Sequence, residues 1–475
     1  MLMVSPGSSR TSSVTLIWLE LARAHKIISS CVSMEIFTRQ SLLLLESAPK
    51  LVPRTWLLIH LIGLLRQHQV GSLWLNFHPP SQSTAIASRI DRSTHMSNHP
   101  MIKKVSVYPV KYPEPNDFNS TRYLTFVKIE ATDGNVGWGE AITQFPGSTK
   151  GTVAIIEDLA DFIVGKDPVH NVGIWKDIRR QTWWYSYRGG LAHFALSAID
   201  IALWDLRGKI TGQSLIEMIG KRDCAPVTEL PALASTHVFQ ADLDKEVERH
   251  AKYVKEGYLG FKIGMGKKGD ARIGYEIERD VNFVRDLRAA AGPKAWIMMD
   301  RGQALNWTFD EVIQRVNAWE ESGLKWVEEP FEPWEFEQFR RLRTHCKTLI
   351  AGSEREWDYR GYTETLGSGT LDVIGCDVGR VEGITGALQI IKLVEAHGAW
   401  FNSHAWSSAI NTAASIALSA STPRCLVQEL KPDPNPMQHD LVKEPFGQVN
   451  GKIAVPNKPG LGVEVIEKTI EKYLF

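Results

Sequence analysis

The chain has 475 residues, 43% of them hydrophobic and 23% charged, a composition typical of globular proteins and sufficient for about two or three domains. Its 54 basic and 54 acidic residues cancel, so neither nucleic acid nor an anionic membrane surface is indicated as a partner. Five cysteines are scattered and lack metal-ligand spacing, which favours reduced thiols and a cytoplasmic location.

Residues 1–95 differ in composition from the rest of the chain. They carry four acidic residues against nine basic ones, with many serines and two leucine-rich patches. The most apolar stretch, Leu51–Leu65, is shorter than the ~20 residues that span a bilayer, and it contains Arg54 and His60. The composition is typical of an organelle transit peptide, which leaves import into an organelle open. We favour an upstream extension with no folded role, because Met96 and Met101 both precede the first strand pattern.

Regular patterns begin at Met101. Apolar residues alternate in KKVSVYPVKY and in YLTFVKIEATDGNVGWGEA, where Asp133-Gly134 predicts a hairpin between antiparallel strands. Helical periodicity follows over Val153–Ile163 and over a long apolar segment that starts at Leu191 and ends in glycine. Residues 101–225 are therefore predicted to form a small α+β domain.

After Pro226 short apolar strands alternate strictly with amphipathic helices. One such helix is predicted over Phe309–Ser322, where Thr308 and Glu311 form a capping-box pattern. Eight strand-and-helix steps in about 200 residues favour a closed barrel over an open sheet. The sequence contains no GxGxxG after a strand, no P-loop and no GxSxG, so nucleotide-binding and serine-hydrolase functions lack their usual motifs. The predicted strands are ELPALAS, LGFKIG, AWIMMD, LKWVEE, TLIAGSE, LDVIGCD, AWFNSH and RCLVQE.

Acidic residues recur where three consecutive predicted strands end. Asp300, Glu328 and Glu354 are 28 and 26 residues apart, about the length of one strand plus one helix. Such strand ends meet on one face of a barrel, where repelling carboxylates would raise one another's pKa values unless a cation neutralised them. Oxygen ligands suit a hard divalent ion, and Mg²⁺ is the expected one. A single acid would more often pair with a helix N-terminus or an arginine, but three consecutive ones favour a metal site.

Four further residues at strand ends suggest acid–base chemistry. Lys262, on the strand before the acids, can serve as a general base beside a metal, although a lysine stem lying along a strand end is the commoner arrangement. His404 offers a second base or acid, and Asp377 on the preceding strand is placed to fix its tautomer. Glu429 continues the same spacing, 25 residues after His404.

Short motifs run in a fixed order through nearly all of residues 101–475. They are GWGEA (137–141), SAIDIALWDLRGK (197–209), FKIG around Lys262, MMDRGQ at Asp300, WVEEP at Glu328, AGSER at Glu354, CDVGRVEGITG at Asp377, NSHAW at His404 and the final PGLGVEV. In these motifs the chain resembles the enolase superfamily, specifically its mandelate racemase subgroup, which contains racemases and many acid-sugar dehydratases.

The resemblance implies an α/β fold. It is a modified TIM barrel, (β/α)₇β, with an α+β capping domain formed by N-terminal and C-terminal segments. Residues 101–225 would form the cap, completed by about 445–475, and residues 226–444 the catalytic barrel.

The resemblance also assigns roles to site residues. Lys262 would lie on one face of the substrate and the His404–Asp377 dyad on the other. Glu429 matches an eighth-strand acid that hydrogen-bonds the substrate carboxylate, for which it must be protonated. The implied Mg²⁺ ligands are Asp300, Glu328 and Glu354.

Two positions depart from the subgroup's pattern. Many members have Lys-x-Lys on the second strand, but here the first position is Gly260, which predicts a higher pKa for Lys262. Gly302 stands where relatives often carry an asparagine, a change that we expect to open space and to remove a polar contact. The substrate therefore cannot be transferred from any one relative.

The predicted reaction is abstraction of a proton α to a carboxylate, with Mg²⁺ offsetting the charge of the enediolate. A β-hydroxyl on the substrate would let the intermediate lose water, with His404 as the acid, so we predict dehydration of an aldonate or aldarate to a 2-keto-3-deoxy acid. Racemisation, epimerisation and cycloisomerisation remain open, because they share the same intermediate. A metal-dependent aldolase or hydrolase is a weaker alternative, and a non-catalytic barrel that binds acid sugars is an alternative from another class.

Substrate selectivity is expected from the cap and from the rim of the barrel. The partner is a small-molecule carboxylate, and a homo-oligomer is expected because barrels of this kind commonly assemble symmetrically. For each single residue proposed to contact the substrate, a role in packing or plain exposure to solvent is an equally good explanation. The candidates are Tyr187 and Arg188 in TWWYSYRGG, with Arg301 and Trp406 in the barrel.

Overall fold

A computed structural model describes residues 99–220, 227–267 and 269–475. The predicted extension over residues 1–95 lies outside these ranges. Within the described ranges, no helix combines the length and the apolar character needed to cross a membrane.

An antiparallel sheet with four helices forms the first part of the described chain. The strands β1 (Ile102–Glu114), β2 (Ser120–Ala131) and β3 (Val136–Ala141) pair in sequence order, and the predicted hairpin at Asp133-Gly134 joins β2 to β3. The hairpin prediction is thus confirmed. The helices are α4 (Pro146–Ile163), α5 (Asn171–Gln181), α6 (Leu191–Thr211) and α7 (Leu215–Ile219).

The long helix α6 packs against strand β3 at unusually short range. A Cβ atom at Gly139 would lie 1.9 Å from the carbonyl oxygen of Ala198, and one at Gly137 would lie 2.1 Å from that of Ala202. Glycine at both positions therefore allows the close approach. Most of α6 is buried, which fits its mostly apolar sequence.

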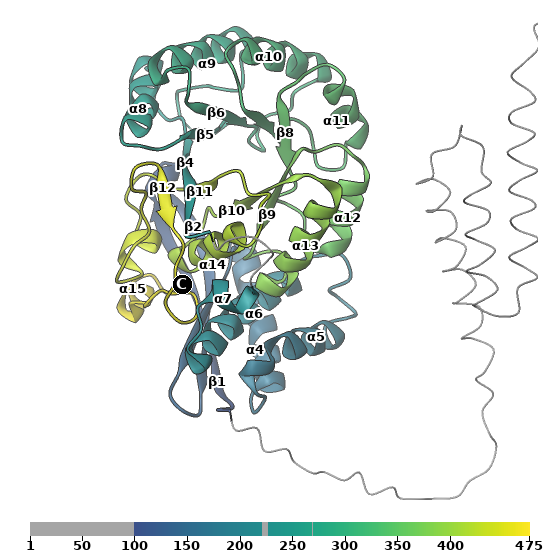
Figure 1. The fold of residues 1–475 in the computed structure, drawn as a ribbon, viewed down its shortest axis with the longest axis vertical. Helices are drawn as coiled ribbons and strands as arrows, with labels where there is room; N and C mark the ends of the chain where they lie inside the picture. The colour runs from purple at the N-terminus through teal and green to yellow at the C-terminus, as the bar shows by residue number, and fades with distance from the viewer. Residues whose placement is uncertain (1–98, 221–226, 268) are drawn as a thin grey trace, which may run out of the picture. The chain divides into compact units, whose positions relative to one another are not determined.

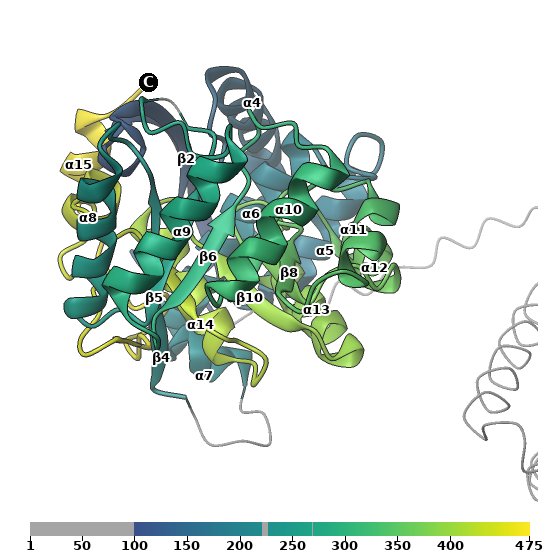
Figure 2. The ribbon, with the colours of Figure 1, turned by 90° about the horizontal axis from the view of Figure 1, so that it is seen from above.

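The remaining chain forms a barrel of eight parallel strands (Figures 1 and 2). The sheet order is β10-β9-β8-β7-β6-β5-β4-β11, and a parallel bridge between Phe401 of β10 and Cys425, just before β11, joins its two ends. The strands are β4 (Glu229–His237), β5 (Gly260–Gly264), β6 (Trp296–Asp300), β7 (Trp326–Glu328), β8 (Leu349–Gly352), β9 (Val373–Asp377), β10 (Trp400–His404) and β11 (Gln428–Leu430).

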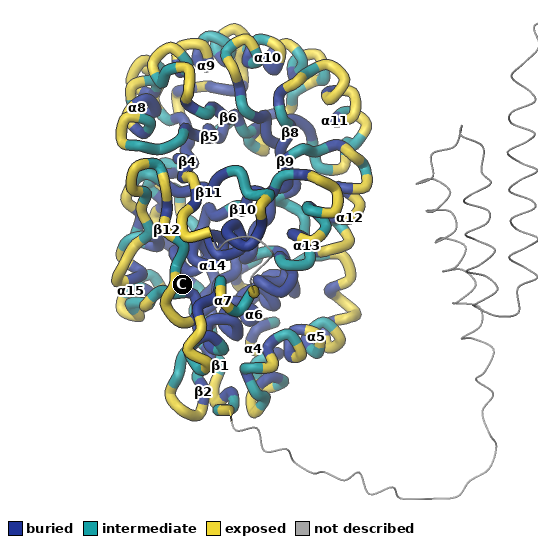
Figure 3. The backbone as a smooth tube through the Cα atoms, viewed as in Figure 1, coloured by how far each residue is buried: buried dark blue, intermediate teal, exposed yellow. Residues whose placement is uncertain are grey.

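Seven helices alternate with these strands, which gives the predicted (β/α)₇β order. The capping box at Thr308 and Glu311 is present at the start of α10, so that prediction is confirmed. In Figure 3 the strands and α14 are largely buried, while the outer faces of α8 to α12 are exposed. The helices are α8 (Leu243–Lys255), α9 (Ile277–Ala291), α10 (Phe309–Glu321), α11 (Phe336–Arg343), α12 (Tyr359–Gly367), α13 (Gly383–His397) and α14 (Ala409–Ala420).

The C-terminal segment returns to the first sheet. Strand β12 (Lys452–Ala454) pairs antiparallel with β4, and helix α15 (Glu467–Lys472) follows it. Leu474 then bridges Val110 of β1, and Glu467 accepts a hydrogen bond of 2.8 Å from the ammonium of Lys128 on β2. The last residues thereby add to the N-terminal sheet, as the resemblance implied.

The two glycines that depart from the subgroup's pattern have packing reasons. A Cβ atom at Gly260 would lie 1.9 Å from the carbonyl oxygen of Trp296, so β5 and β6 approach too closely there for a lysine. The expectation that Gly302 opens space is wrong. A Cβ atom at Gly302 would lie 2.1 Å from the carbonyl oxygen of Met265, so backbone already fills that position.

Gly260 is expected to be intolerant of any side chain. Gly260→Ala should lower the free energy of unfolding by about 2–4 kcal/mol, because two strand backbones must separate. Gly173→Ala is the matched control, since this exposed glycine in α5 has no atom within 4 Å of an added Cβ and the change should stabilise by about 0.4–1 kcal/mol. Urea unfolding of both variants tests this, and equal stabilities would contradict it.

Candidate active site

Three acidic residues stand at the carboxyl ends of consecutive barrel strands. Asp300 closes β6 and Glu328 closes β7, and these two residues are partners in the strand register. Glu354 follows two residues after the end of β8. The side chain of Glu328 is buried, while those of Asp300 and Glu354 remain about one quarter exposed. The predicted acidic cluster is therefore present, with an opening toward solvent.

The backbone beside two of these acids adopts an uncommon conformation. Glu329 has φ 42° and Ser353 has φ 78°, both in the left-handed region that residues other than glycine rarely adopt. Each residue sits next to a proposed ligand, after Glu328 and before Glu354 respectively. Such strain persists only where the surrounding structure enforces it, and it concentrates at functional sites.

The ammonium of Lys262, on β5, lies among the carboxylates. Its Nζ is 3.0 Å from Glu328 Oε1, 3.0 Å from Glu429 Oε1 and 3.9 Å from Asp300 Oδ2. Burial lowers the pKa of Lys262, but the surrounding carboxylates, Glu328 and Glu429 foremost, outweigh burial and raise it well above the ordinary value. Lys262 is therefore charged in this arrangement, as the glycine at position 260 led us to expect.

The acids themselves respond to burial and to one another. Burial raises the pKa of Asp300 and raises that of Glu328 well above its usual range, with repulsion from neighbouring acids adding to the effect. Burial also acts on Glu354, but His404, Lys262 and other cations outweigh it and lower its pKa to about 2. Asp300 and Glu328 therefore tend to hold protons unless further positive charge neutralises them.

His404 and Asp377 form the predicted dyad. The Nδ1 of His404 is 2.5 Å from Asp377 Oδ2, and its Nε2 is 3.5 Å from Glu354 Oε2. Burial lowers the pKa of His404, but Glu354 and Asp377 outweigh burial and raise it to about 9. With a carboxylate on each ring nitrogen, the imidazole holds a proton that it can donate.

A buried network connects the dyad to the first sheet. Asp377 Oδ1 accepts hydrogen bonds from Gly379 N at 2.8 Å and from Asn411 Nδ2 at 3.2 Å. Asn411 N in turn donates to Glu140 of β3, which also accepts from both the backbone N–H and the hydroxyl of Ser408. Glu140 thus fixes the start of α14, and α14 fixes the aspartate that orients His404.

Glu429 completes the cluster from β11. Its Oε1 accepts a hydrogen bond of 2.6 Å from Asn402 Nδ2, while its Oε2 is buried without a hydrogen-bond partner among the described residues. An unpartnered buried acceptor is unusual and can be satisfied by a bound ligand. This placement agrees with the implied contact between Glu429 and a substrate carboxylate.

The predicted substrate contacts fall in different places. Trp406 is buried beside His237, with ring centroids 4.6 Å apart. Arg301 uses its guanidinium for the carbonyl oxygens of Glu329 and Leu305 and for the carboxylate of Glu332.

Tyr187 and Arg188 lie together at the surface beside helix α12. The ring of Tyr187 is exposed and contacts Arg360, and Arg188 pairs with Glu364. The structure thus brings Trp406 to the barrel mouth. Arg301, Tyr187 and Arg188 instead contact Glu332, Arg360 and Glu364, respectively.

Sequence reasoning missed four residues that shape the site. Glu140 lies in the GWGEA motif, and Asn411 lies five positions after the end of NSHAW, so both are in or near motifs that carried the resemblance. His237 ends β4, at a strand end like the acids. Lys267, in the loop after β5, lowers the pKa values of Asp300 and Glu354 by its charge, and no sequence pattern indicated this.

The donor set at the strand ends fits a divalent cation. Asp300, Glu328 and Glu354 offer oxygen atoms that hard ions prefer, and these three carboxyl groups outnumber the one ammonium, that of Lys262, that lies among them. Their oxygens do not all approach within 4.8 Å of one another. Among the described residues, a different group of side chains brings its ligand atoms within 4.8 Å of one another. This group consists of His193, Asp358 and Glu382.

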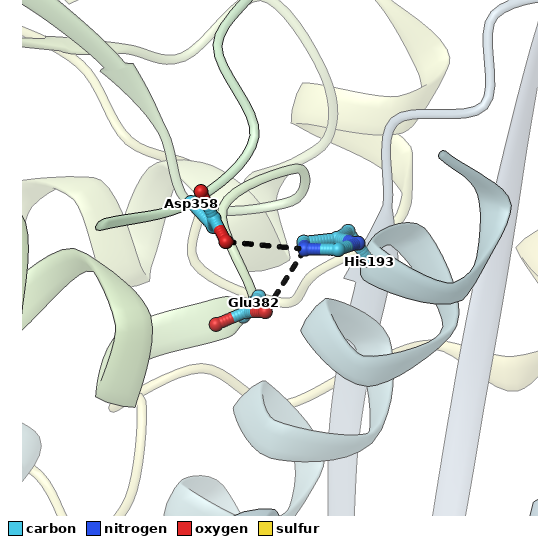
Figure 4. A group of neighbouring side chains, drawn as sticks. All are labelled: His193, Asp358 and Glu382. Atoms are coloured by element: carbon cyan, nitrogen blue, oxygen red, sulfur yellow. Dashed lines mark ion pairs between the residues drawn. The ribbon is translucent and has the colours of Figure 1, made fainter. Parts of the chain in front are cut away.

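This second group joins the cap to the barrel (Figure 4). The imidazole of His193 on α6 points toward both carboxylates, 3.0 Å from Glu382 Oε1 and 4.0 Å from Asp358 Oδ2. Arg179 on α5 also pairs with both acids, and Arg360 pairs with Asp358. The two carboxylates are thus neutralised by two guanidinium groups, so the group fits an ion-pair connection better than a metal centre.

Comparison with known proteins identifies the family of the chain. Residues 108–220 match the Mandelate racemase / muconate lactonizing enzyme N-terminal domain, and residues 245–469 match the description Enolase C-terminal domain-like. The chain belongs to the mandelate racemase / muconate lactonizing enzyme family. The relatives of this chain include dehydratases, which are lyases, and a cycloisomerase, which is an isomerase. The chain is accordingly an enzyme.

Individual relatives cover most of the described chain. The L-rhamnonate dehydratase of Saccharopolyspora erythraea is 30% identical over 71% of this chain and 82% of its own length. The D-galactarolactone cycloisomerase of Agrobacterium fabrum is 28% identical over 74% of this chain and 91% of its own. Among solved structures, the 3,6-anhydro-D-galactonate cycloisomerase of Zobellia galactanivorans is 26% identical, with a TM-score of 0.70 over 79% of this chain and 99% of its own.

The buried carboxyl of Glu140 predicts a pH-dependent stability. Burial raises its pKa to about 7 from an ordinary value of 4.5, partly offset by the hydrogen bonds from Ser408 and Asn411. Because the folded pKa is raised, the stabilisation is complete below the unfolded pKa and is lost as the pH rises through about 7. Relative to Glu140→Gln, which cannot titrate, the wild type should lose on the order of 2 kcal/mol of unfolding free energy between pH 5 and pH 8.

Urea unfolding of both proteins at the two pH values provides the measurement. A difference between wild type and Glu140→Gln that stays constant with pH would contradict the prediction.

Proposed function

We propose that the enzyme abstracts the proton α to the carboxylate of an acid sugar and then eliminates water, forming a 2-keto-3-deoxy acid. One observation carries this proposal. Lys262 Nζ and His404 Nε2, from strands β5 and β10, both lie against the same group of strand-end carboxylates, at 3.0 Å from Glu328 and 3.5 Å from Glu354. Two proton-transfer groups therefore flank one acidic cluster.

The cluster explains the need for a cation. A divalent ion such as Mg²⁺, held by Asp300, Glu328 and Glu354, would supply positive charge next to the oxygens that become negative when the α-proton leaves. Burial and mutual repulsion raise the pKa values of Asp300 and Glu328, so these acids favour a bound positive charge, either a proton or the cation that replaces it. Glu429 is positioned to contact the same carboxylate from β11, through the oxygen that has no partner in the protein.

The steps balance without any other reactant. A base on one face takes the α-proton, and the electron pair left behind is delocalised into the carboxylate as an enediolate. That pair then forms the double bond to the β-carbon while the β-carbon–oxygen bond breaks. The departing hydroxyl takes a proton from His404 and leaves as water, and the resulting enol tautomerises to the keto acid. His404 suits the acid role because both ring nitrogens face carboxylates.

Lys262 is the candidate base on the opposite face. As an ammonium it cannot accept a proton, so this role requires the negative charge around it to be neutralised first. Neutralisation of Glu328 and Asp300 would remove two of the carboxylates that now raise its pKa. The cation would then bind first, the substrate second, and proton transfer would follow.

Isomerisation is the second candidate. The Agrobacterium fabrum relative and the Zobellia galactanivorans structure are both named cycloisomerases, and this chemistry uses the same first step. The products distinguish the two candidate reactions. A dehydratase yields a keto acid, whereas an isomerase conserves the mass of its substrate.

The proposal predicts a loss of turnover in two variants. With Mg²⁺ and a panel of aldonates and aldarates, Lys262→Ala and His404→Asn should each lower kcat by roughly 10²–10⁴-fold, because each removes a proton-transfer group. Keto-acid formation provides the assay, and mass spectrometry of the products distinguishes dehydration from isomerisation.

Matched controls come from the exposed side of α13. Lys392→Ala and His397→Asn change the same residue types away from the cluster and should leave kcat within about twofold. Full turnover by both site variants would refute the proposed function.

A further inference from the structure

We propose that the substrate is a dicarboxylic acid sugar, an aldarate, whose second carboxylate binds at a subsite formed by His237, Lys267 and Arg122. This inference rests on the proposed function, since it concerns the end of the substrate that does not react. The three residues come from β4, from the loop after β5 and from β2 of the cap, respectively. We refer to them as the distal subsite.

His237 is a buried side chain without hydrogen bonds. It is 7% exposed, and neither ring nitrogen has a hydrogen-bond partner among the described residues. The nearest carboxylate oxygen, Asp117 Oδ1, is 4.0 Å from its Nε2, which is too far for a hydrogen bond. Buried polar groups are almost always hydrogen-bonded, so two unpartnered nitrogens on one ring point to a ligand.

The ring stands close to the reactive centre. His237 is the register partner of Gly264, and Ser235, two residues earlier, is the partner of Lys262. One strand spacing and two residues of rise place the Cα atoms of His237 and Lys262 roughly 8 Å apart. On its other side, the ring contacts Trp406, which follows His404 by two residues. The distal subsite and the acidic cluster therefore share one barrel mouth.

Lys267 brings an uncompensated cation to this position. A Cβ atom built on Gly264 would meet His237 Nδ1 at 2.3 Å and Lys267 Cε at 3.3 Å, so both side chains converge on the same point of β5. Among the described residues, no carboxylate lies within ion-pair distance of Lys267. Its charge lowers the pKa values of His237, Asp300 and Glu354.

Arg122 closes the subsite from the cap. Its guanidinium lies over the ring of Trp406, 4.9 Å from the centroid, and donates to Asp117 Oδ2 at 3.2 Å. Asp117 balances the charge of Arg122, so Lys267 remains as the excess cation. Burial, followed by the charges of Lys267 and Arg122, lowers the pKa of His237 well below its usual range, so the ring is neutral and offers one N–H donor.

These features select one chemical class. A neutral donor, a free ammonium and a guanidinium match a carboxylate, which accepts several charge-assisted hydrogen bonds. The terminal hydroxymethyl group of an aldonate would leave the charge of Lys267 unneutralised. The distal subsite should therefore favour the diacid over the monoacid of the same sugar configuration.

The test compares diacid and monoacid pairs of equal configuration. Galactarate against galactonate and glucarate against gluconate are assayed with the full-length protein and Mg²⁺, and kcat/KM is determined for each acid. For at least one pair the diacid should be preferred by roughly tenfold or more. Lys267→Gln and His237→Asn should each lower that preference by about tenfold, with the loss expressed mainly in KM for the diacid.

Lys252→Gln on the exposed face of α8 is the matched control and should leave the preference unchanged. Turnover of monoacids with no preference for diacids would overturn the inference but leave the proposed function standing. An unchanged preference in both subsite variants would also overturn it. Absence of turnover and of α-proton exchange with every acid would instead refute the proposed function.

Discussion

Electrostatic repulsion among buried carboxylates is the constraint on which the rest of this structure depends. Asp300, Glu328 and Glu429 converge on one ammonium, that of Lys262, which lies within 3.9 Å of all three. Together with Glu354 these acids outnumber the cations in contact with them, Lys262 and the protonated His404, and burial makes ionisation of all four acids costly. The arrangement would be destabilising in a purely structural role. It is physically reasonable as a site that recruits a divalent cation and then uses that charge to stabilise an anionic intermediate.

The cap contributes to the same site through buried polar connections. Glu140 of β3 holds the start of α14 by three hydrogen bonds, and Asn411 of that helix donates to Asp377. A second connection joins Arg179 and His193 to Glu382, in the loop that follows Asp377. The orientation of His404 therefore depends on residues from both parts of the chain. The dyad is thus held in place by contacts from the cap and from the barrel.

The sequence predicted the fold well because its signals are periodic. Eight apolar runs at regular spacing located all eight strands, and the acids at their ends located Asp300, Glu328 and Glu354. Contacts set by the backbone could not be predicted in this way. The carbonyl of Met265 fills the space beside Gly302, and the left-handed conformations of Glu329 and Ser353 have no counterpart in the apolar periodicity. Lys267 was missed because loop residues follow no period, so its proximity to His237 appears only in three dimensions.

The central claim is that the strand-end carboxylates collect a divalent cation. Crystals grown with Mn²⁺ in place of Mg²⁺ test it most directly, because the anomalous signal of manganese locates the ion without reference to activity. The account predicts a peak in contact with Asp300, Glu328 and Glu354. A peak at His193, Asp358 and Glu382 instead, or no peak at saturating Mn²⁺, would contradict it.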